Sequence, residues 1–567
     1  MDLHQELKFH RTRIVRNRGN RAVKKVLLLN APVIKYNEFQ IDNEKRTKNI
    51  SYPPLGLAYL GAVLRQESPD IEIKIVDLNF ESLKVMFSTG KKDNVLENCL
   101  QEALRGFDPD LVGISVVFSI AIGNGRKIAA KVKEYDPRII VCFGGVHCTF
   151  EYKSILSDPC ADVVFFHEAE NSFTHYIKFL NGESREDSVD GIGFLGEEGR
   201  VVEIPYQSFP DFDKLPLPAW DLLPTADYHR YSQFSGVKNI QDKDVPTAII
   251  QGERGCSSRC AFCSVRNFNG KHIRARSPEN ILKEIDLLYH DFGVRYIDFV
   301  DDDFSYDRRR VIAICDALIQ RKYDLVWTLD NGIRLVTLNE EVIEKLLGAG
   351  CRLISVGVES GNAEILRKIR KPLTLEILYE KAALLHKYPD LYVKGNFIVG
   401  FPFESDEQME DTFRVAREVQ FDQAATSIYS PLVGTDALSY SKDTEGMDIE
   451  FGNDNFGKTL IDRFNNQEFY NKVYINNLRT NFIENPNYKG RNLERALKDF
   501  LRVINTNCPD HAVAVYCVSK IYETLKDERN QKKYSERFKD IIKDSENWRF
   551  YCRQLNISYE SSSIKQG

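Results

Sequence analysis

The stretch RGCSSRCAFCS at residues 254–264 places three cysteines close together, at the spacing C-x3-C-x2-C. A structural metal site normally takes four ligands, and the next cysteine along the chain is Cys315. Three thiolates at this spacing suit a 4Fe–4S cluster in which one iron keeps an open coordination site for catalysis. A zinc site completed by a distant residue such as His272 is the alternative.

The composition describes an ordinary globular protein that is too long for one core. At 567 residues, with 43% hydrophobic and 28% charged residues, the chain is expected to form three or four domains. The net charge of −6 provides no general basic field, so we expect no nucleic-acid partner. No stretch is long and apolar enough for an integral membrane segment.

The cysteine content and the start of the chain bear on the compartment. Twelve cysteines without a secretory signal indicate a reducing, cytoplasmic location. Nine of them are scattered, and burial in the core is the default for each. The basic start, residues 1–24, lacks the apolar region of a signal peptide. We expect a flexible solvated arm there, with a mitochondrial-type presequence as the alternative.

Residues 25–190 alternate short apolar runs with amphipathic helical stretches. This pattern predicts an α/β domain, a doubly wound parallel sheet whose ligands bind at the carboxyl ends of the strands. The expected strands are 25–30, 71–77, 111–117, 138–145 and 162–166. The candidate binding residues in the loops at those ends are Pro54, Ser115, Gly144, Gly145 and His147. Paired glycines allow close approach of a bulky ligand, although a structural turn and a satisfied loop histidine explain these residues equally well.

A proline-rich linker, residues 191–240, separates this domain from a second run of strand–helix units at 241–440. Four prolines between residues 209 and 224 suit a stiff crossing. The second run predicts six parallel strands in a partial (β/α)6 barrel, with its site at the strand ends. Residues 441–567 form a small helical C-terminal domain, in which 492–542 faintly resembles one tetratricopeptide-type hairpin. We expect that hairpin to pack on the barrel, because a single unit cannot bury its own face.

Several motifs together resemble the cobalamin-binding radical S-adenosylmethionine (radical SAM) enzyme family. C-x3-C-x2-C is the radical SAM signature, and PPLGLAYLGAVL, DPDLVGIS and GGVHCTF resemble the cobalamin domain that precedes the catalytic barrel. The family's usual GExE stretch is His167-Glu168-Ala169-Glu170 here, which leaves the contacts of that loop open. The cobalt-ligating motif D-x-H-x-x-G is absent, so we expect no histidine from that motif on cobalt.

The resemblance assigns further residues to the cofactors and leaves the catalytic residue unknown. It implies that Cys256, Cys260 and Cys263 hold the 4Fe–4S cluster and that Phe262 is the aromatic before the third cysteine. The residues implied to bind S-adenosylmethionine are Arg334, Glu359, Ser360, Gly400 and Pro402. Glu359 could instead cap the next helix, and Arg334 could pair with a nearby acid. The acids at 301–303 are expected to face water or substrate.

The function implied by the resemblance is radical chemistry with three cofactors. They are a 4Fe–4S cluster, S-adenosylmethionine and cobalamin, with a flavodoxin- or ferredoxin-type electron donor. Methylation of an unactivated carbon in a small-molecule or lipid substrate is the leading outcome. Rearrangement or oxidative cyclisation without methyl transfer, and a cobalamin/Fe–S redox sensor, are the alternatives.

Overall fold

The chain folds as two compact units. The computed structural model describes residues 3–41, 49–233, 240, 244–445 and 462–559. The first unit comprises residues 1–331, 348–350 and 431–456, and the second comprises residues 332–347, 351–430 and 457–567. The cobalamin-type domain and the cysteine stretch therefore belong to one compact body. None of the described helices is long and apolar enough to span a bilayer.

A seven-stranded sheet organises the N-terminal part of the first unit. Its strands are β1 (Lys25–Asn30), β3 (Glu72–Asp77), β4 (Leu111–Ser115), β5 (Ile140–Gly144), β6 (Val163–Phe165), β7 (Ile192–Leu195) and β8 (Val201–Ile204). They lie in the order β3-β1-β4-β5-β6-β7-β8, parallel as far as β6. The last two strands are antiparallel and extend the sheet beyond residue 190, into the range expected to be linker.

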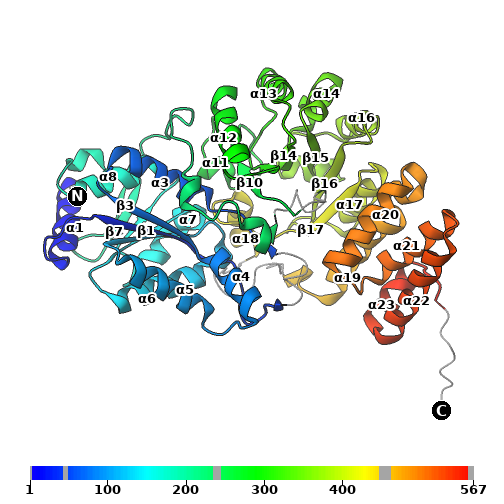
Figure 1. Ribbon diagram of the computed structural model, residues 1–567, viewed down its shortest axis with the longest axis horizontal. Coiled ribbons are helices and arrows are strands. Elements are labelled where there is room, and N and C mark those ends of the chain that lie inside the picture. The colour runs from blue at the N-terminus through cyan, green and yellow to red at the C-terminus, as the bar shows by residue number, and fades with distance from the viewer. Residues whose placement is uncertain (1–2, 42–48, 234–239, 241–243, 446–461, 560–567) are drawn as a thin grey trace, which may run out of the picture. The chain divides into compact units, whose positions relative to one another are not determined.

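Helices cover both faces of this sheet, which confirms the doubly wound arrangement. They are α3 (Leu55–Glu67), α4 (Leu78–Thr89), α5 (Val95–Phe107), α6 (Ile122–Tyr135), α7 (Val146–Leu156) and α8 (Glu170–Leu180). Figure 1 shows α3 and α8 on one side of the sheet, with α5 and α6 on the other. Apolar side chains from the central strands and from α4, α5 and α6 form the core between them. The carboxyl ends of the strands are left free to line a site.

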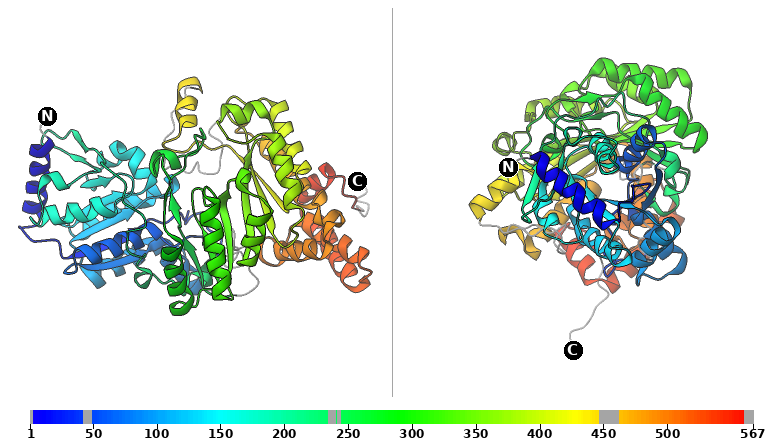
Figure 2. Two further views of the ribbon diagram at one scale, coloured as in Figure 1. Left: turned by 90° about the horizontal axis from the view of Figure 1, so that it is seen from above. Right: turned by 90° about the vertical axis from the view of Figure 1, so that its left-hand side faces the viewer.

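The basic start of the chain is a helix packed on this domain, so the expectation of a flexible arm was wrong. Helix α1 (Leu3–Asn17) buries Leu7, His10 and Ile14, and Figure 2 (right) shows it lying across the domain. His10 Nε2 lies 2.8 Å from the hydroxyl of Tyr176 in α8. Basic residues occupy the positions between these buried ones, so the helical spacing of the apolar residues is hard to recognise in so charged a segment.

The proline-rich segment is held at several buried points. The Trp220 indole Nε1 donates to Glu284 Oε1 at 2.8 Å, and the other carboxylate oxygen of Glu284 pairs with Arg276. Glu284 lies in α12 (Pro278–Asp291), whereas Arg276 also donates to the Tyr59 hydroxyl of α3 at 3.3 Å. Trp220, Arg276 and Glu284 are almost fully buried. This buried network joins the N-terminal sheet to the barrel segment within the first unit, beyond what a stiff spacer would do.

The barrel segment carries the six predicted strands, three in each unit. In the first unit, β10 (Thr247–Ile250), β13 (Tyr296–Phe299) and β14 (Val326–Ile333) pair in parallel. In the second, β15 (Cys351–Glu359), β16 (Tyr392–Val399) and β17 (Gln423–Ile428) do the same. The helices between them are α13 (Arg308–Arg321), α14 (Glu340–Gly348), α15 (Ala363–Lys368), α16 (Leu375–Leu385) and α17 (Asp406–Glu418). Helix α18 (Asp436–Glu445) follows β17.

The C-terminal helices form a domain with its own core. They are α19 (Gln467–Leu478), α20 (Leu493–Arg502), α21 (Ala512–Thr524), α22 (Glu528–Asp544) and α23 (Glu546–Gln554). Apolar side chains from all five of these helices, among them Phe500, Val515 and Cys552, pack together. The predicted hairpin is therefore part of a larger bundle that buries its face internally.

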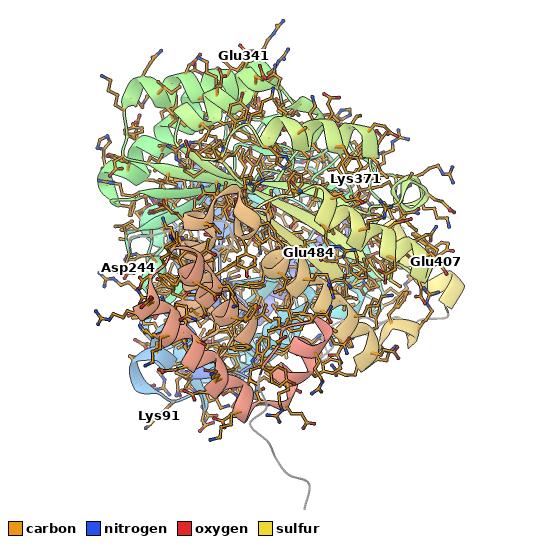
Figure 3. All side chains as sticks on the ribbon, turned by 90° about the vertical axis from the view of Figure 1, so that its right-hand side faces the viewer. Lys91, Asp244, Glu341, Lys371, Glu407 and Glu484 are labelled. Atoms are coloured by element: carbon orange, nitrogen blue, oxygen red, sulfur yellow. The ribbon has the colours of Figure 1, made fainter. Side chains whose placement is uncertain are left out.

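A row of asparagines completes the free edge of β17. Asn481 Oδ1 accepts from Ala424 N and its Nδ2 donates to Ala424 O, both at 2.8 Å. Asn477 makes the same pair of bonds with Thr426, at 3.1 and 2.8 Å. The two asparagines are four residues apart, which is a rise of about 6 Å along a helix. Their partners in β17 are two residues apart, which is a rise of about 6.7 Å along a strand, so the two spacings match. Glu484, labelled in Figure 3, lies in this same stretch of chain, just beyond Asn481. These side chains act as a substitute strand for the edge.

Replacing Asn481 by alanine should therefore destabilise the protein. The change leaves the N–H and C=O of Ala424 without their partners, at a cost of about 1–3 kcal/mol in the free energy of unfolding. Denaturant unfolding monitored by circular dichroism measures this cost. Asn505→Ala, at an exposed position of the same helical domain, is the matched control and should change stability by less than about 0.5 kcal/mol. Equal effects of the two substitutions would contradict the role of the row.

Candidate functional site

The three cysteines lie on a loop that a short β-ladder closes. Strands β11 (Glu253–Arg254) and β12 (Arg274–Ala275) pair antiparallel on either side of it, and α11 (Val265–Phe268) follows the third cysteine. All three cysteines lie outside any disulfide bond and are partly exposed. Zinc would need ligands gathered within about 2.3 Å of one point, and across the described residues no three Cys, His, Asp or Glu side chains converge in that way.

Buried acids brace the start of this loop. Asp301 Oδ1 accepts from Gly252 N at 2.5 Å, and Asp302 Oδ2 accepts from Gly255 N at 2.8 Å. Asp303 N in turn donates to Glu253 Oε1 at 2.5 Å. Burial raises the pKa values of Glu253 and Asp301, with the neighbouring acids adding to the shift of Glu253. The expectation that the acids at 301–303 face water or substrate was wrong for Asp301 and Asp303, which are buried.

A buried ion-pair cluster ties the cysteine loop to the loop that follows β6. Arg254 Nη1 donates to Glu168 Oε2 at 2.8 Å and to Glu170 Oε1 at 2.6 Å. Arg274 also pairs with Glu168, through both of its terminal nitrogens. The side chains of Arg254, Glu168 and Glu170 are at most 6% exposed. The contacts of the His167–Glu170 stretch, left open by the sequence, are thus made to the strands that flank the cysteines.

Aromatic rings surround the central arginine of this cluster. The Arg254 guanidinium carbon lies 4.8 Å from the ring centre of Tyr59 and 4.3 Å from that of Phe212. Burial lowers the pKa of Arg254, but the carboxylates of Glu170 and Glu168 outweigh that effect and the net shift is upward. The arginine therefore stays charged, and the two carboxylates compensate its charge at a site that is buried from water.

A cavity of about 740 Å³ lies within the first unit, between the strand ends of the N-terminal sheet and those of the barrel segment. Four of the residues expected to bind a ligand line it, namely Pro54, Ser115, Gly144 and Gly145. A Cβ at Gly145 would lie 2.7 Å from Val116 O, and its φ of +106° favours glycine. The fifth, His147, is buried with its Nδ1 3.0 Å from Ser119 Oγ and does not line the cavity.

Other cavity-lining residues were missed by sequence reasoning. Val117 and Phe118, in the loop after β4, are 44% and 54% exposed although apolar. Apolar side chains that continue past a strand end are the signal that could have indicated them. His167, Glu168 and Arg254 line the same cavity, as do Asp298 and Asp330 at the ends of barrel strands. Their grouping depends on which loops meet, which a single sequence does not show.

The residues implied to bind S-adenosylmethionine all belong to the second unit. Glu359 has φ +71° and accepts a hydrogen bond from Lys371 Nζ at 3.0 Å (Lys371 is labelled in Figure 3). Ser360 is fully buried, with its Oγ 3.1 Å from Thr412 Oγ1. Phe262 lies on the cysteine loop and is partly exposed, and Arg334 precedes a short 3-10 turn.

The glycine–proline loop after β16 rests on a buried acid that the sequence did not indicate. Glu404 Oε2 accepts from Gly400 N at 2.7 Å and from Phe401 N at 3.1 Å. Burial raises the pKa of Glu404 to about 7. Gly400, with φ +84°, takes a conformation that favours glycine. The turn that carries Gly400 and Pro402 is therefore held in one shape by its own carboxylate.

Comparison with known proteins agrees with this geometry. The radical SAM superfamily model matches residues 251–416, and the B12 binding domain model matches residues 49–177. An uncharacterized methyltransferase of Pyrococcus horikoshii is 30% identical over 399 residues, which cover 70% of this chain and 80% of that protein. The chain is a B12-binding radical SAM enzyme. Its family assigns it a 4Fe–4S cluster, S-adenosylmethionine and cobalamin as cofactors.

Two other curated relatives of this radical SAM enzyme carry named activities. The cytidylyl-2-hydroxyethylphosphonate methyltransferase of Streptomyces wedmorensis is 28% identical over 68% of this chain and 77% of its own. The anaerobic magnesium-protoporphyrin IX monomethyl ester cyclase of Rubrivivax gelatinosus is 26% identical, over 67% of this chain and 65% of its own. The relatives thus include both methyltransferases and a cyclase.

Solved structures share the fold. The cobalamin-dependent S-adenosylmethionine radical enzyme OxsB, at 17% identity, covers 95% of this chain and 82% of its own with a TM-score of 0.61. The radical S-adenosylmethionine methyltransferase TsrM from Kitasatospora setae, at 16% identity, covers 75% and 79% with a TM-score of 0.58. The predicted order of parallel-sheet domain, radical SAM domain and helical C-terminus is confirmed.

Removing the central arginine of the ion-pair cluster should be strongly destabilising. Arg254→Ala removes the counter-charge of buried Glu170 and leaves Glu168 with Arg274 alone. Breaking a buried ion pair in this way costs about 3–5 kcal/mol in the free energy of unfolding. Arg254→Lys keeps the charge but loses the planar fork, so its effect should be intermediate. Arg414→Ala removes an exposed arginine with two acidic neighbours and should cost at most about 1 kcal/mol. Denaturant unfolding of the three variants measures the order, and an Arg254→Ala protein as stable as Arg414→Ala would contradict it.

Proposed function

We propose that this radical SAM enzyme is a cobalamin-dependent methyltransferase that acts on an unactivated carbon of a small-molecule or lipid substrate. One observation carries the proposal. A single cavity in one compact unit is lined by strand-end loops of the B12-type sheet, by α11 beside the cysteine loop, and by barrel strand ends. The relatives with the two highest identities quoted above are both named methyltransferases.

The residues present fit the cofactors. Cys256, Cys260 and Cys263 would ligate the cluster, since all three lie on one loop. Gly144 and Gly145 would let the corrin approach the backbone, and Val117 and Phe118 would offer it an apolar surface. When bound, the cluster and S-adenosylmethionine supply a radical that removes a hydrogen atom, and cobalamin supplies a methyl group.

The protein's own residues would position these groups and keep water away. The ion-pair cluster around Arg254 holds the cysteine loop against the loop after β6, and the bracing acids hold its backbone. Reaction between groups bound on different loops depends on near-contact distances, so rigid attachment of both loops matters. The largely apolar lining of the cavity excludes water from reactive intermediates.

In the second unit we propose that Glu359, Arg334, Gly400 and Pro402 contact S-adenosylmethionine. The positive φ of Glu359, a strained conformation for a residue with a side chain, supports a role for this residue. Its partner Lys371 argues against simple capping of the next helix. Ser360 is bonded within the protein and would act by shaping the loop. A flavodoxin- or ferredoxin-type protein would supply the electron.

Two other candidate functions can be distinguished from methylation by experiment. Cyclisation or rearrangement without methyl transfer is the second candidate, because cyclases are among the relatives. A cobalamin/Fe–S redox sensor is the third, and the cavity between the two cofactor regions favours an enzyme over it. Methyl transfer from S-adenosylmethionine separates methylation from the other two functions, and formation of 5′-deoxyadenosine separates the cyclase from the sensor.

Filling the cavity at Gly56 should abolish corrin binding without unfolding the protein. Gly56 lies in α3, lines the cavity, and has no atom within 4 Å of an added Cβ. Gly56→Phe should reduce retention of hydroxocobalamin after desalting at least tenfold, measured by corrin absorbance. The control is Gly106→Phe, at a glycine of α5 whose added Cβ would meet only Lys74 Nζ at 3.9 Å and which does not line the cavity. Retention by both variants would show that the corrin does not occupy this cavity.

Methyl transfer should be detectable before the substrate is known. Reconstituted protein, hydroxocobalamin, titanium(III) citrate and methyl-labelled S-adenosylmethionine, incubated without oxygen, should yield S-adenosylhomocysteine and label in the corrin fraction. Cys260→Ala should lose its iron and form no 5′-deoxyadenosine, whereas Cys160→Ala, at a cysteine outside the cluster loop, should keep both. If 5′-deoxyadenosine forms with neither S-adenosylhomocysteine nor labelled corrin, methyl transfer is excluded and the cyclase-type function is favoured.

A further inference from the structure

His167 has an unusual backbone for a residue with a side chain. It follows β6 with a φ of +55°, in the left-handed region that favours glycine. Its backbone N–H donates to Thr149 Oγ1 at 2.8 Å, and the next residue in the chain, Glu168, belongs to the ion-pair cluster. The surrounding contacts therefore hold His167 in a strained conformation. Strain that is maintained in this way is a recognised mark of a functional position.

The imidazole is held in one orientation and one tautomer. Nδ1 lies 2.9 Å from the backbone oxygen of Phe268, and a carbonyl can only accept, so Nδ1 carries the proton. The rings of Tyr206, Phe209 and Phe268 lie with their centres 5.0–6.0 Å from that of His167 and fix its plane. In the neutral ring the lone pair is then on Nε2, for which no described residue supplies a hydrogen-bond donor.

We infer that Nε2 of His167 accepts a hydrogen bond from a ligand in the cavity, and that the donor is a primary amide at the edge of the corrin. His167 lines the cavity together with Gly144 and Gly145, at the carboxyl ends of two neighbouring strands, β5 and β6. The corrin ring carries amide side chains around its rim, and a few well-placed polar groups orient a ligand in a mostly apolar cavity. The inference rests on the proposed function, because it needs cobalamin in this cavity.

The geometry makes His167 preorganised for this bond. Its backbone, its Nδ1 and its ring plane are each restrained by a different neighbour, so little conformational freedom remains to be lost on binding. His147, to which the sequence pointed, is not arranged in this way, since it is buried and bonded to Ser119. The structure thus moves the polar contact from the helix after β5 to the loop after β6.

Titration of full-length protein with hydroxocobalamin, followed by absorbance, tests the inference. His167→Phe keeps a ring against the three aromatic neighbours and removes the acceptor, so the affinity should fall about three- to tenfold. His167→Gln restores an acceptor and should bind more tightly than His167→Phe. His386→Phe, at a histidine that is bonded to Val419 O and does not line the cavity, should bind like the parent.

Other results would overturn the inference. His167→Phe binding hydroxocobalamin as tightly as the parent would do so, and so would nitrogen hyperfine splitting from His167 on the cobalt(II) signal, which would mean axial ligation instead. Should His167→Phe be less stable, His167→Gly, which relieves the strained backbone, must show the same loss of affinity. Failure of the parent protein to bind any corrin would defeat the proposed function itself, which separates the two failures.

Discussion

The buried pairing of Arg254 with Glu168 and Glu170 is the interaction on which the site depends. Three charges removed from water are tolerated only when each has its counter-charge and its hydrogen bonds, and here the partners come from two loops far apart in the sequence. The pairing therefore allows one arrangement of the loop after β6 against the cysteine loop. A hydrophobic contact in the same place would tolerate sliding, whereas directional bonds do not.

Neighbouring elements make the same arrangement rigid. The Trp220–Glu284–Arg276 network reaches Tyr59, whose ring also contacts Arg254. Asp301 and Asp302, which follow β13, hold the backbone of the cysteine loop. The acids lie just after β13, at a strand end, where a parallel sheet leaves loops free. The result is a cavity whose walls are set by hydrogen bonds, while the apolar core supplies stability elsewhere.

The second unit shows how conformation, more than residue type, assigns a role. Ser360 and Glu359 are adjacent, yet one is fully buried and bonded to Thr412 while the other takes a positive φ beside Lys371. Glu404 holds the turn that contains Gly400. The asparagine row on β17 performs a similar task for the sheet edge, where side chains stand in for backbone. Polar residues in this unit thus maintain the shape of strand ends and edges.

The sequence by itself determined the order of the domains, the five parallel strands of the N-terminal sheet, the six strands of the barrel segment and the cysteine motif, because hydrophobic period and motif spacing are local properties of the chain. It also indicated Gly144 and Gly145, since paired glycines after a strand mark a close approach. Only the tertiary structure decided that His167 and not His147 lines the cavity, and that Glu168 and Glu170 bind Arg254. Those outcomes depend on which loops meet in space, and on burial, which converts an ordinary pair of charges into a constraint that the fold must satisfy.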